Sequence, residues 1–251
     1  MNSRLLRPCL ALGVAVPLAI AAAVLPARAQ KSIEPFFQTN LKDLSAEVKV
    51  VAKNDTELRK IGKGYVDAYA LTDRRFSYKE PGKVRADGKR GLITMRMVTN
   101  GDRKLMQISF PPIRRIEDLK KNPGKADSIS DLGLLTPDWL PDHEYAWQRT
   151  ETKDGRNCEV FRVWDKRDPA YKHTYWIDVQ TKTLVEHIAH FRNRKKPGFK
   201  KRFVFSKPTL VSGVWVPTEM TVYNPEDKPA GTVRYQNLKV NTGLSDSIFK
   251  L

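Results

Sequence analysis

Cysteine is scarce in this chain, with two residues among 251, at positions 9 and 158. Cys9 lies in an N-terminal segment that we expect to be removed, so the mature protein keeps Cys158 alone. A single cysteine cannot form an intramolecular disulfide, and the fold must therefore depend on its hydrophobic core. The neighbouring residues Glu159-Val160-Phe161 are typical of a strand, and nothing beside the thiol would lower its pKa. We predict a buried, unreactive thiol.

The sequence also lacks the common signatures of catalytic, metal and phosphate sites. It contains no Gly-x-Ser-x-Gly, no His-Glu-x-x-His and no phosphate-binding loop. His187 and His190 are three residues apart, which places them on opposite faces of a strand, and His143 and His173 stand alone. We therefore predict that the protein is not an enzyme, with no catalytic residue, no metal site and no cofactor. A hydrolase whose residues meet only in space remains a competing interpretation.

Long apolar runs are absent except at the N-terminus. Residues 9–25 carry no charge, follow Arg4 and Arg7, and lead into Ala27-Arg28-Ala29, which is the pattern of a cleavable secretory signal. The run covers about 17 residues around Pro17, which is short for a permanent membrane anchor of roughly 20. We predict a signal peptide over residues 1–29, a single domain over residues 30–251 and a periplasmic location. An uncleaved anchor is the alternative.

Acidic residues are few: 28 face 45 lysines and arginines, for a net charge of +17. Cleavage would remove Arg4, Arg7 and Arg28 and leave +14. This charge favours a polyanionic neighbour such as an anionic membrane surface, and export argues against nucleic acid. The simpler interpretation is that the charge only keeps the protein soluble.

The densest basic segment spans residues 192–202 around the turn signal Pro197-Gly198. We predict a hairpin tip that binds anionic lipid headgroups; a merely solvated hairpin is the alternative. The seven basic residues of this predicted surface are Arg192, Arg194, Lys195, Lys196, Lys200, Lys201 and Arg202.

Alternation of apolar and polar residues dominates the rest of the chain. It begins with Ala46, Val48, Val50 and Ala52 on one face, and it recurs to Val240. Turn signals separate the runs at Asn100-Gly101, Asp154-Gly155, Ser212-Gly213 and elsewhere. This pattern predicts one antiparallel meander. Residues 64–75 are ambiguous but compatible with a strand.

Two segments break the alternation and predict helices. The first is residues 32–44, where Ile33, Phe37 and Leu41 follow helical spacing. The second is an insertion near 111–142 that begins with Ile113 and Ile116 and ends in turns. Because a curved sheet must cover its apolar face, we expect these helices to lie on it.

The C-terminal half carries motifs that resemble a known family. They are a Trp-x-Asp strand end at Trp176 and Asp178, a Gly-x-Trp-x-Pro strand at Gly213, Trp215 and Pro217, and an Asn-x-Gly-Leu-x-Asp-x-x-Phe ending at Asn241, Gly243, Leu244, Asp246 and Phe249. The mature chain resembles the outer-membrane lipoprotein-sorting, LolA-like family. That resemblance implies a mainly β fold, an incomplete antiparallel β-barrel covered by a few short helices, around an apolar cavity for acyl chains.

The inward faces of the predicted strands supply an apolar wall for such a cavity, although alternation alone cannot distinguish a hollow barrel from a filled one. The segment 132–140 is either a mouth loop or a core plug. The candidate cavity residues are Val48, Val50, Met95, Met97, Met106, Ile108, Phe110, Leu134, Trp139, Phe203 and Phe205.

From these features we expect a carrier or sensor of a lipid or lipoprotein acyl chain, in or beside outer-membrane lipoprotein sorting. An envelope membrane protein or an anionic membrane surface is the expected further partner. The alternative is an envelope scaffold or interaction protein with a filled core and a basic surface-binding hairpin.

Overall fold

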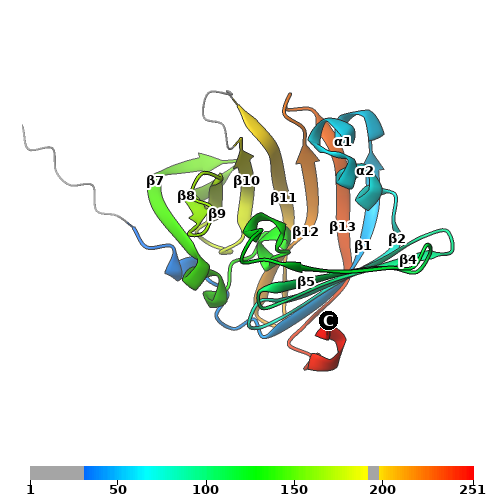
Figure 1. Ribbon diagram of the computed structural model, residues 1–251. Helices are drawn as coiled ribbons and strands as arrows, with labels where there is room; N and C mark the ends of the chain where they lie inside the picture. The colour runs from blue at the N-terminus through cyan, green and yellow to red at the C-terminus, as the bar shows by residue number, and fades with distance from the viewer. Residues whose placement is uncertain (1–30, 192–197) are drawn as a thin grey trace, which may run out of the picture.

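The computed structural model describes residues 31–191 and 198–251, and its main feature is one large curved sheet (Figure 1). Thirteen strands follow the order β6-β5-β4-β3-β2-β1-β13-β12-β11-β10-β9-β8-β7. Strands that follow one another in the chain pair antiparallel, except β6 and β7, and β1 also pairs antiparallel with β13. The edge strands β6 and β7 do not pair with each other, so the sheet is an incomplete barrel. The predicted fold class is confirmed.

The strands follow the alternating runs of the sequence. They are β1 Asp43–Lys53, β2 Thr72–Lys79, β3 Lys83–Arg90, β4 Ile93–Asn100, β5 Arg103–Ile108, β6 Ile113–Asp118, β7 His143–Lys153, β8 Arg156–Asp165, β9 Lys172–Asp178, β10 Leu184–His190, β11 Phe199–Val211, β12 Val214–Tyr223 and β13 Pro229–Val240. Asn100-Gly101 joins β4 to β5 as predicted. At Asp154-Gly155 and Ser212-Gly213 both residues have positive φ, which is the geometry of a two-residue turn that suits the twist of a hairpin.

Two α-helices that the sequence analysis did not predict follow β1. They are α1 Asp55–Ile61 and α2 Lys63–Tyr69, so the interpretation of residues 64–75 as a strand is wrong up to Tyr69. The Asn54 side chain accepts hydrogen bonds from the backbone N–H groups of Thr56 and Glu57, at 3.1 and 3.2 Å. This is an N-cap signal that the sequence contains. The helix pair lies against one end of β13 and β1 (Figure 1).

The insertion near 111–142 is helical only in its second part. Residues 113–118 form strand β6, in which Ile113 pairs with Ile108 and Ile116 with Leu105. The helix expected there is wrong, because the segment pairs along its whole length with β5, and Ile113 and Ile116, three residues apart, lie on opposite faces of the resulting edge strand. The remainder holds three 3-10 helices, η2 Pro123–Lys125, η3 Ile129–Leu132 and η4 Pro137–Asp142, which lie over the concave face of the sheet (Figure 1).

The helix expected over residues 32–44 is also wrong, since only the short η1 Glu34–Phe36 is helical. Ile33, Phe37 and Leu41 are nevertheless buried. The N–H of Gln38 donates to the carbonyl oxygen of Leu135 at 2.8 Å. The segment thus buries its apolar residues as an irregular chain packed against the insertion, and the helical spacing was coincidental.

The main hydrophobic core lies between the concave face of the sheet and these covering segments. Two smaller clusters lie elsewhere: Cys158, Val160, Trp176 and Val185 form one, and Val98 and Leu105 with Phe249 form the other. Cys158 is fully buried and burial raises its pKa to about 11, which confirms the predicted unreactive thiol. Within residues 31–191 and 198–251, no helix has the length and apolar character needed to span a bilayer.

Candidate functional site

A cavity of about 670 Å³ lies on the concave side of the sheet. Strands β1 to β6 and β10 to β13 contribute to its wall. It is covered by α2, through Tyr65 and Tyr69, and by residues 124–132 of the insertion. The volume is within the roughly 300–1,000 Å³ typical of sites that enclose small molecules. Side chains therefore do not completely fill the concave side of the sheet at this place, and the space opens partly to solvent.

Five of the eleven predicted cavity residues line this space: Val48, Met97, Met106, Phe203 and Phe205. Strand register brings the two methionines together, because Met97 pairs with Met106 across β4 and β5. The opposite wall is aromatic, with the phenylalanines of β11 on the same inward face. Flexible thioethers facing rigid rings suit an acyl chain of variable shape.

The other predicted cavity residues occupy three different places. Met95 and Ile108 pair with each other on the same face of β4 and β5 as the cavity methionines, one step closer to the strand ends. Phe110, just beyond β5, is 72% exposed. Leu134 and Trp139 are buried in the main core, and Val50 packs against that core from its edge.

Charged side chains occupy one part of the cavity wall, and most of them are paired. Lys104 contacts Asp127 at 2.7 Å, and Lys125 contacts Glu117 at 2.9 Å. Ion pairing with Lys125 lowers the pKa of Glu117. These pairs leave Arg74, Lys201 and Asp131 as the charged lining residues without an ion-pair partner among the residues that the structure describes.

Asp131 is a carboxylate in the cavity wall with a raised pKa. Its side chain is exposed, yet burial deep in the molecule raises the pKa of its carboxyl group. The residue lines the cavity. One carboxylate oxygen accepts a hydrogen bond from the N–H of Ser128 at 3.1 Å, completing the capping box of η3.

Helix α2 places two tyrosines on the cavity side, one turn apart. The hydroxyl of Tyr65 accepts a hydrogen bond from Nζ of Lys201 at 2.7 Å. The ring of Tyr69 lies against Gly231, where an added Cβ would come within 2.3 Å of the ring. Only glycine allows this close packing of helix on strand, so Gly231 sets the position of α2 over the cavity.

Sequence reasoning missed a pair of buried histidines beside the cavity. Nδ1 of His173 and Nε2 of His187 lie 2.8 Å apart across β9 and β10, so the view that His173 stands alone is wrong. Burial lowers the pKa of His173 to about 3 and holds that of His187 well below its usual value. The described residues contain no group of three metal-ligating side chains. The pair is neutral, and His187 reaches the cavity wall.

This pair predicts a loss of stability in mild acid. The pKa values of both histidines are lower in the folded state than the roughly 6.5 of an unfolded chain. Unfolding therefore takes up protons below about pH 6.5, and the free energy of unfolding falls from there towards about pH 3. Urea unfolding of the wild type and of His173→Gln/His187→Gln between pH 7.5 and 4.5 tests this. The slope should be shallower in the double variant, and equal slopes would contradict the assignment.

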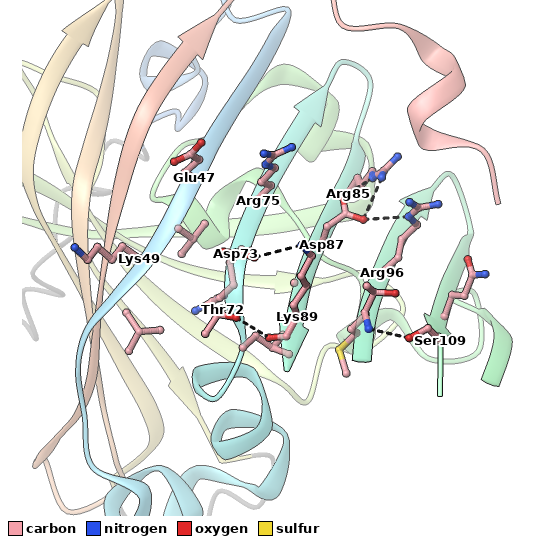
Figure 2. A pocket seen from close by; sticks show the side chains of 18 of the residues that line it. Glu47, Lys49, Thr72, Asp73, Arg75, Arg85, Asp87, Lys89, Arg96 and Ser109 are labelled. Atoms are coloured by element: carbon pink, nitrogen blue, oxygen red, sulfur yellow. Dashed lines mark hydrogen bonds and ion pairs between the residues drawn. The ribbon is translucent and has the colours of Figure 1, made fainter. Parts of the chain in front are cut away.

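A second hollow, of about 760 Å³, lies where β1 and β2 separate (Figure 2). Some of its charged residues pair with one another: Asp87 contacts Arg85 at 2.6 Å and Arg96 at 3.0 Å. Val48 and Arg74 line both hollows and form the wall between them. Six lysines and arginines and three carboxylates line this hollow, whereas methionines, phenylalanines and tyrosines dominate the wall of the inner cavity. The inner cavity is therefore the stronger candidate site for an apolar ligand.

The predicted basic surface is only partly described. Arg192, Arg194, Lys195 and Lys196 lie outside the described residues. Lys201 points into the cavity, and Arg202 contacts Glu186 at 2.9 Å and Asp227 at 2.5 Å. Lys200 is exposed and lies near the ring of Tyr171. Binding of an anionic surface by this hairpin stays a prediction.

Comparison with solved structures identifies the class of fold. The chain is similar to a DUF1329 family protein from Desulfovibrio piger, with 17% identity, a TM-score of 0.60, and coverage of 87% of this chain and 92% of that one. A putative outer membrane lipoprotein-sorting protein domain from Vibrio parahaemolyticus has 13% identity and a TM-score of 0.58, with coverage of 87% of this chain and 93% of that one. A LolA superfamily protein from Nitrosomonas europaea has 14% identity and a TM-score of 0.55, with coverage of 87% of this chain and 94% of that one. The fold is that of the LolA-like proteins.

A family model described as "Uncharacterized protein" matches residues 112–251, more than half of the chain, and the chain belongs to that family. A search of curated protein sequences found no match. The resemblance to LolA-like proteins that the motifs indicated is thus confirmed by the structure.

Proposed function

We propose that this protein is an exported carrier or sensor that encloses the acyl chain of a lipid or lipoprotein in its inner cavity. The observation that carries the proposal is the cavity itself, about 670 Å³ in volume, lined by methionines of β4 and β5 and by phenylalanines of β11. Hollow space among apolar side chains forgoes packing contacts that an acyl chain would restore. The LolA-like fold, shared with a putative outer membrane lipoprotein-sorting domain, supports the same class of ligand.

The cell envelope is the place where such a carrier would act. The predicted signal peptide over residues 1–29, outside the described residues, supports periplasmic export. A binding role, rather than catalysis, agrees with the neutral and buried state of the His173–His187 pair. A scaffold with a filled core, the alternative from the sequence, is disfavoured by the cavity.

Native mass spectrometry of the protein purified from a periplasmic fraction tests the proposal. We expect bound species whose added mass corresponds to acyl lipids. After delipidation, the protein should bind a fluorescent fatty acid saturably, with one ligand for each chain. Protein that carries no lipid and shows no saturable binding would overturn the carrier hypothesis and favour the scaffold.

A further inference from the structure

An unpaired arginine in the cavity wall suggests which end of a ligand is held there. Arg74 lies on β2 at the point where its pairing with β1 ends, opposite Val48. Its Nη1 atom is buried and has no hydrogen-bond partner within the part of the chain that the structure describes. The residue as a whole is half-buried, so the cost falls on this one N–H group, because a buried donor without an acceptor loses the hydrogen bonds that it makes in water.

A tyrosine beside this arginine also carries an unsatisfied polar group. The guanidinium carbon of Arg74 lies 5.8 Å from the centre of the Tyr69 ring, and the Tyr69 hydroxyl is the other buried side-chain group without a partner among the described residues. Both residues line the inner cavity. Two buried donors that lack an acceptor, at the boundary of one empty space, indicate that the missing acceptor comes from outside the chain.

The charge balance gives the sign of the missing group. The carboxylates of Asp127 and Glu117 are matched by lysines 104 and 125, and the pKa of Asp131 is raised. Lys201 adds a second cation, held by the Tyr65 hydroxyl one helical turn from Tyr69. Burial lowers the pKa of Arg74, as expected where no anion faces it. The charged lining residues without an ion-pair partner among the described residues are thus two cations, Arg74 and Lys201, and one carboxyl, Asp131, which leaves an excess of positive charge.

We propose that the cavity binds anionic amphiphiles, with the ligand's carboxylate or phosphate held by Arg74 and the Tyr69 hydroxyl and its acyl chain against the methionines of β4 and β5. This inference rests on the proposed carrier function and adds the chemical class of the headgroup. A guanidinium can donate two hydrogen bonds to either anion, so the two heads share one recognition chemistry. An uncharged lipid would leave the arginine unpaired.

The test compares ligands with the same chain length and different heads. Delipidated protein is titrated with palmitate, hexadecyl phosphate and hexadecanol by displacement of a fluorescent fatty alcohol. The wild type should bind at least one anionic ligand about tenfold or more tightly than hexadecanol, the scale of one charge-assisted hydrogen bond. The tighter of the two anions identifies the head. Equal affinity for all three would overturn the inference and leave the carrier function standing.

Variants at the site and a matched neighbour complete the test. Arg74→Met should remove the preference for the anion, leave hexadecanol binding unchanged, and leave thermal stability equal or higher, since a buried unpaired charge is lost. Tyr69→Phe removes only the hydroxyl and should weaken anion binding several-fold. Arg75→Met, the exposed neighbour on the opposite face of β2, should change nothing. An equal loss of anion and alcohol binding in Arg74→Met would show that the arginine is only structural.

Discussion

Filling the floor of the cavity with two indoles, in the double variant Met97→Trp/Met106→Trp, is expected to weaken acyl-chain binding by about tenfold or more. The two methionines are a directly opposed pair on β4 and β5, and both line the cavity. Larger rings at these positions would occupy space that the ligand needs, and the empty volume above them allows the change without crowding the core. Titration with the fluorescent fatty acid measures the effect.

The same two strands provide a matched control. Arg96 and Gln107 form the next opposed pair, and their side chains point to the other face of the sheet. The double variant Arg96→Trp/Gln107→Trp adds equal bulk in the same strands without entering the cavity. It should bind the fatty acid like the wild type. If both double variants lose binding equally, the effect comes from distortion of the sheet, and the cavity is not the ligand site.

Removal of one carboxylate at the start of β1 is expected to cost about 3 kcal/mol of stability. Asp43 is 3% exposed. Its side chain accepts hydrogen bonds from the backbone N–H groups of Thr242 and Gly243, both at 2.9 Å, and of Leu244 at 3.3 Å. The variant Asp43→Ala would leave three donors at the end of β13 without their acceptor.

The hydrogen bonds of Asp43 also fix the chain that leads to the outer face of the cavity strands β4 and β5. Beyond it, η5 Asp246–Phe249 places Phe249 on Val98 and Leu105, the outward-facing residues of β4 and β5. Urea unfolding with an unchanged m-value should report the loss. Glu47→Ala, an exposed carboxylate on the same strand, should change stability by no more than about 0.5 kcal/mol. Equal effects of the two variants would contradict the role of Asp43.

The family motifs of the sequence correspond to turns of this kind. Asp178, the end of the Trp-x-Asp motif, accepts hydrogen bonds from the N–H of Gln180 at 3.0 Å and the hydroxyl of Thr181 at 2.8 Å. Asn241 accepts from the N–H of Lys42 at 2.7 Å. Such residues recur because each satisfies specific backbone groups, and they therefore indicated the fold without indicating the ligand.

Alternation along single strands allowed part of the candidate site to be predicted. A period of two fixes which residues share a face, so Met97, Met106, Phe203 and Phe205 could be assigned to one apolar side. Alternation does not tell which positions along a strand lie at the cavity. Met95 lies on the same face but nearer the end of β4, and Phe110 lies beyond the end of β5, where it is exposed.

Arg74 and the histidine pair depended on contacts between strands. Arg74 follows a residue with positive φ, Asp73, where the register of β2 against β3 shifts, and periodicity cannot be followed through such an irregularity. His173 and His187 meet because β9 and β10 pair in one particular register. The pairing register of two strands cannot be predicted from the alternation within each strand.

The sequence by itself determined a basic, cysteine-poor chain with a meander of strands and turns, because charge, cysteine content and period-two alternation are local properties of the chain. Only the tertiary structure decided that α2 and residues 124–132 cover the sheet and that a cavity remains beneath them. It also decided that Arg74 lines this space with its Nη1 atom lacking a hydrogen-bond partner among the described residues. These features depend on segments far apart in sequence that come together when the sheet curves, and no local pattern records how completely they fill the space between them.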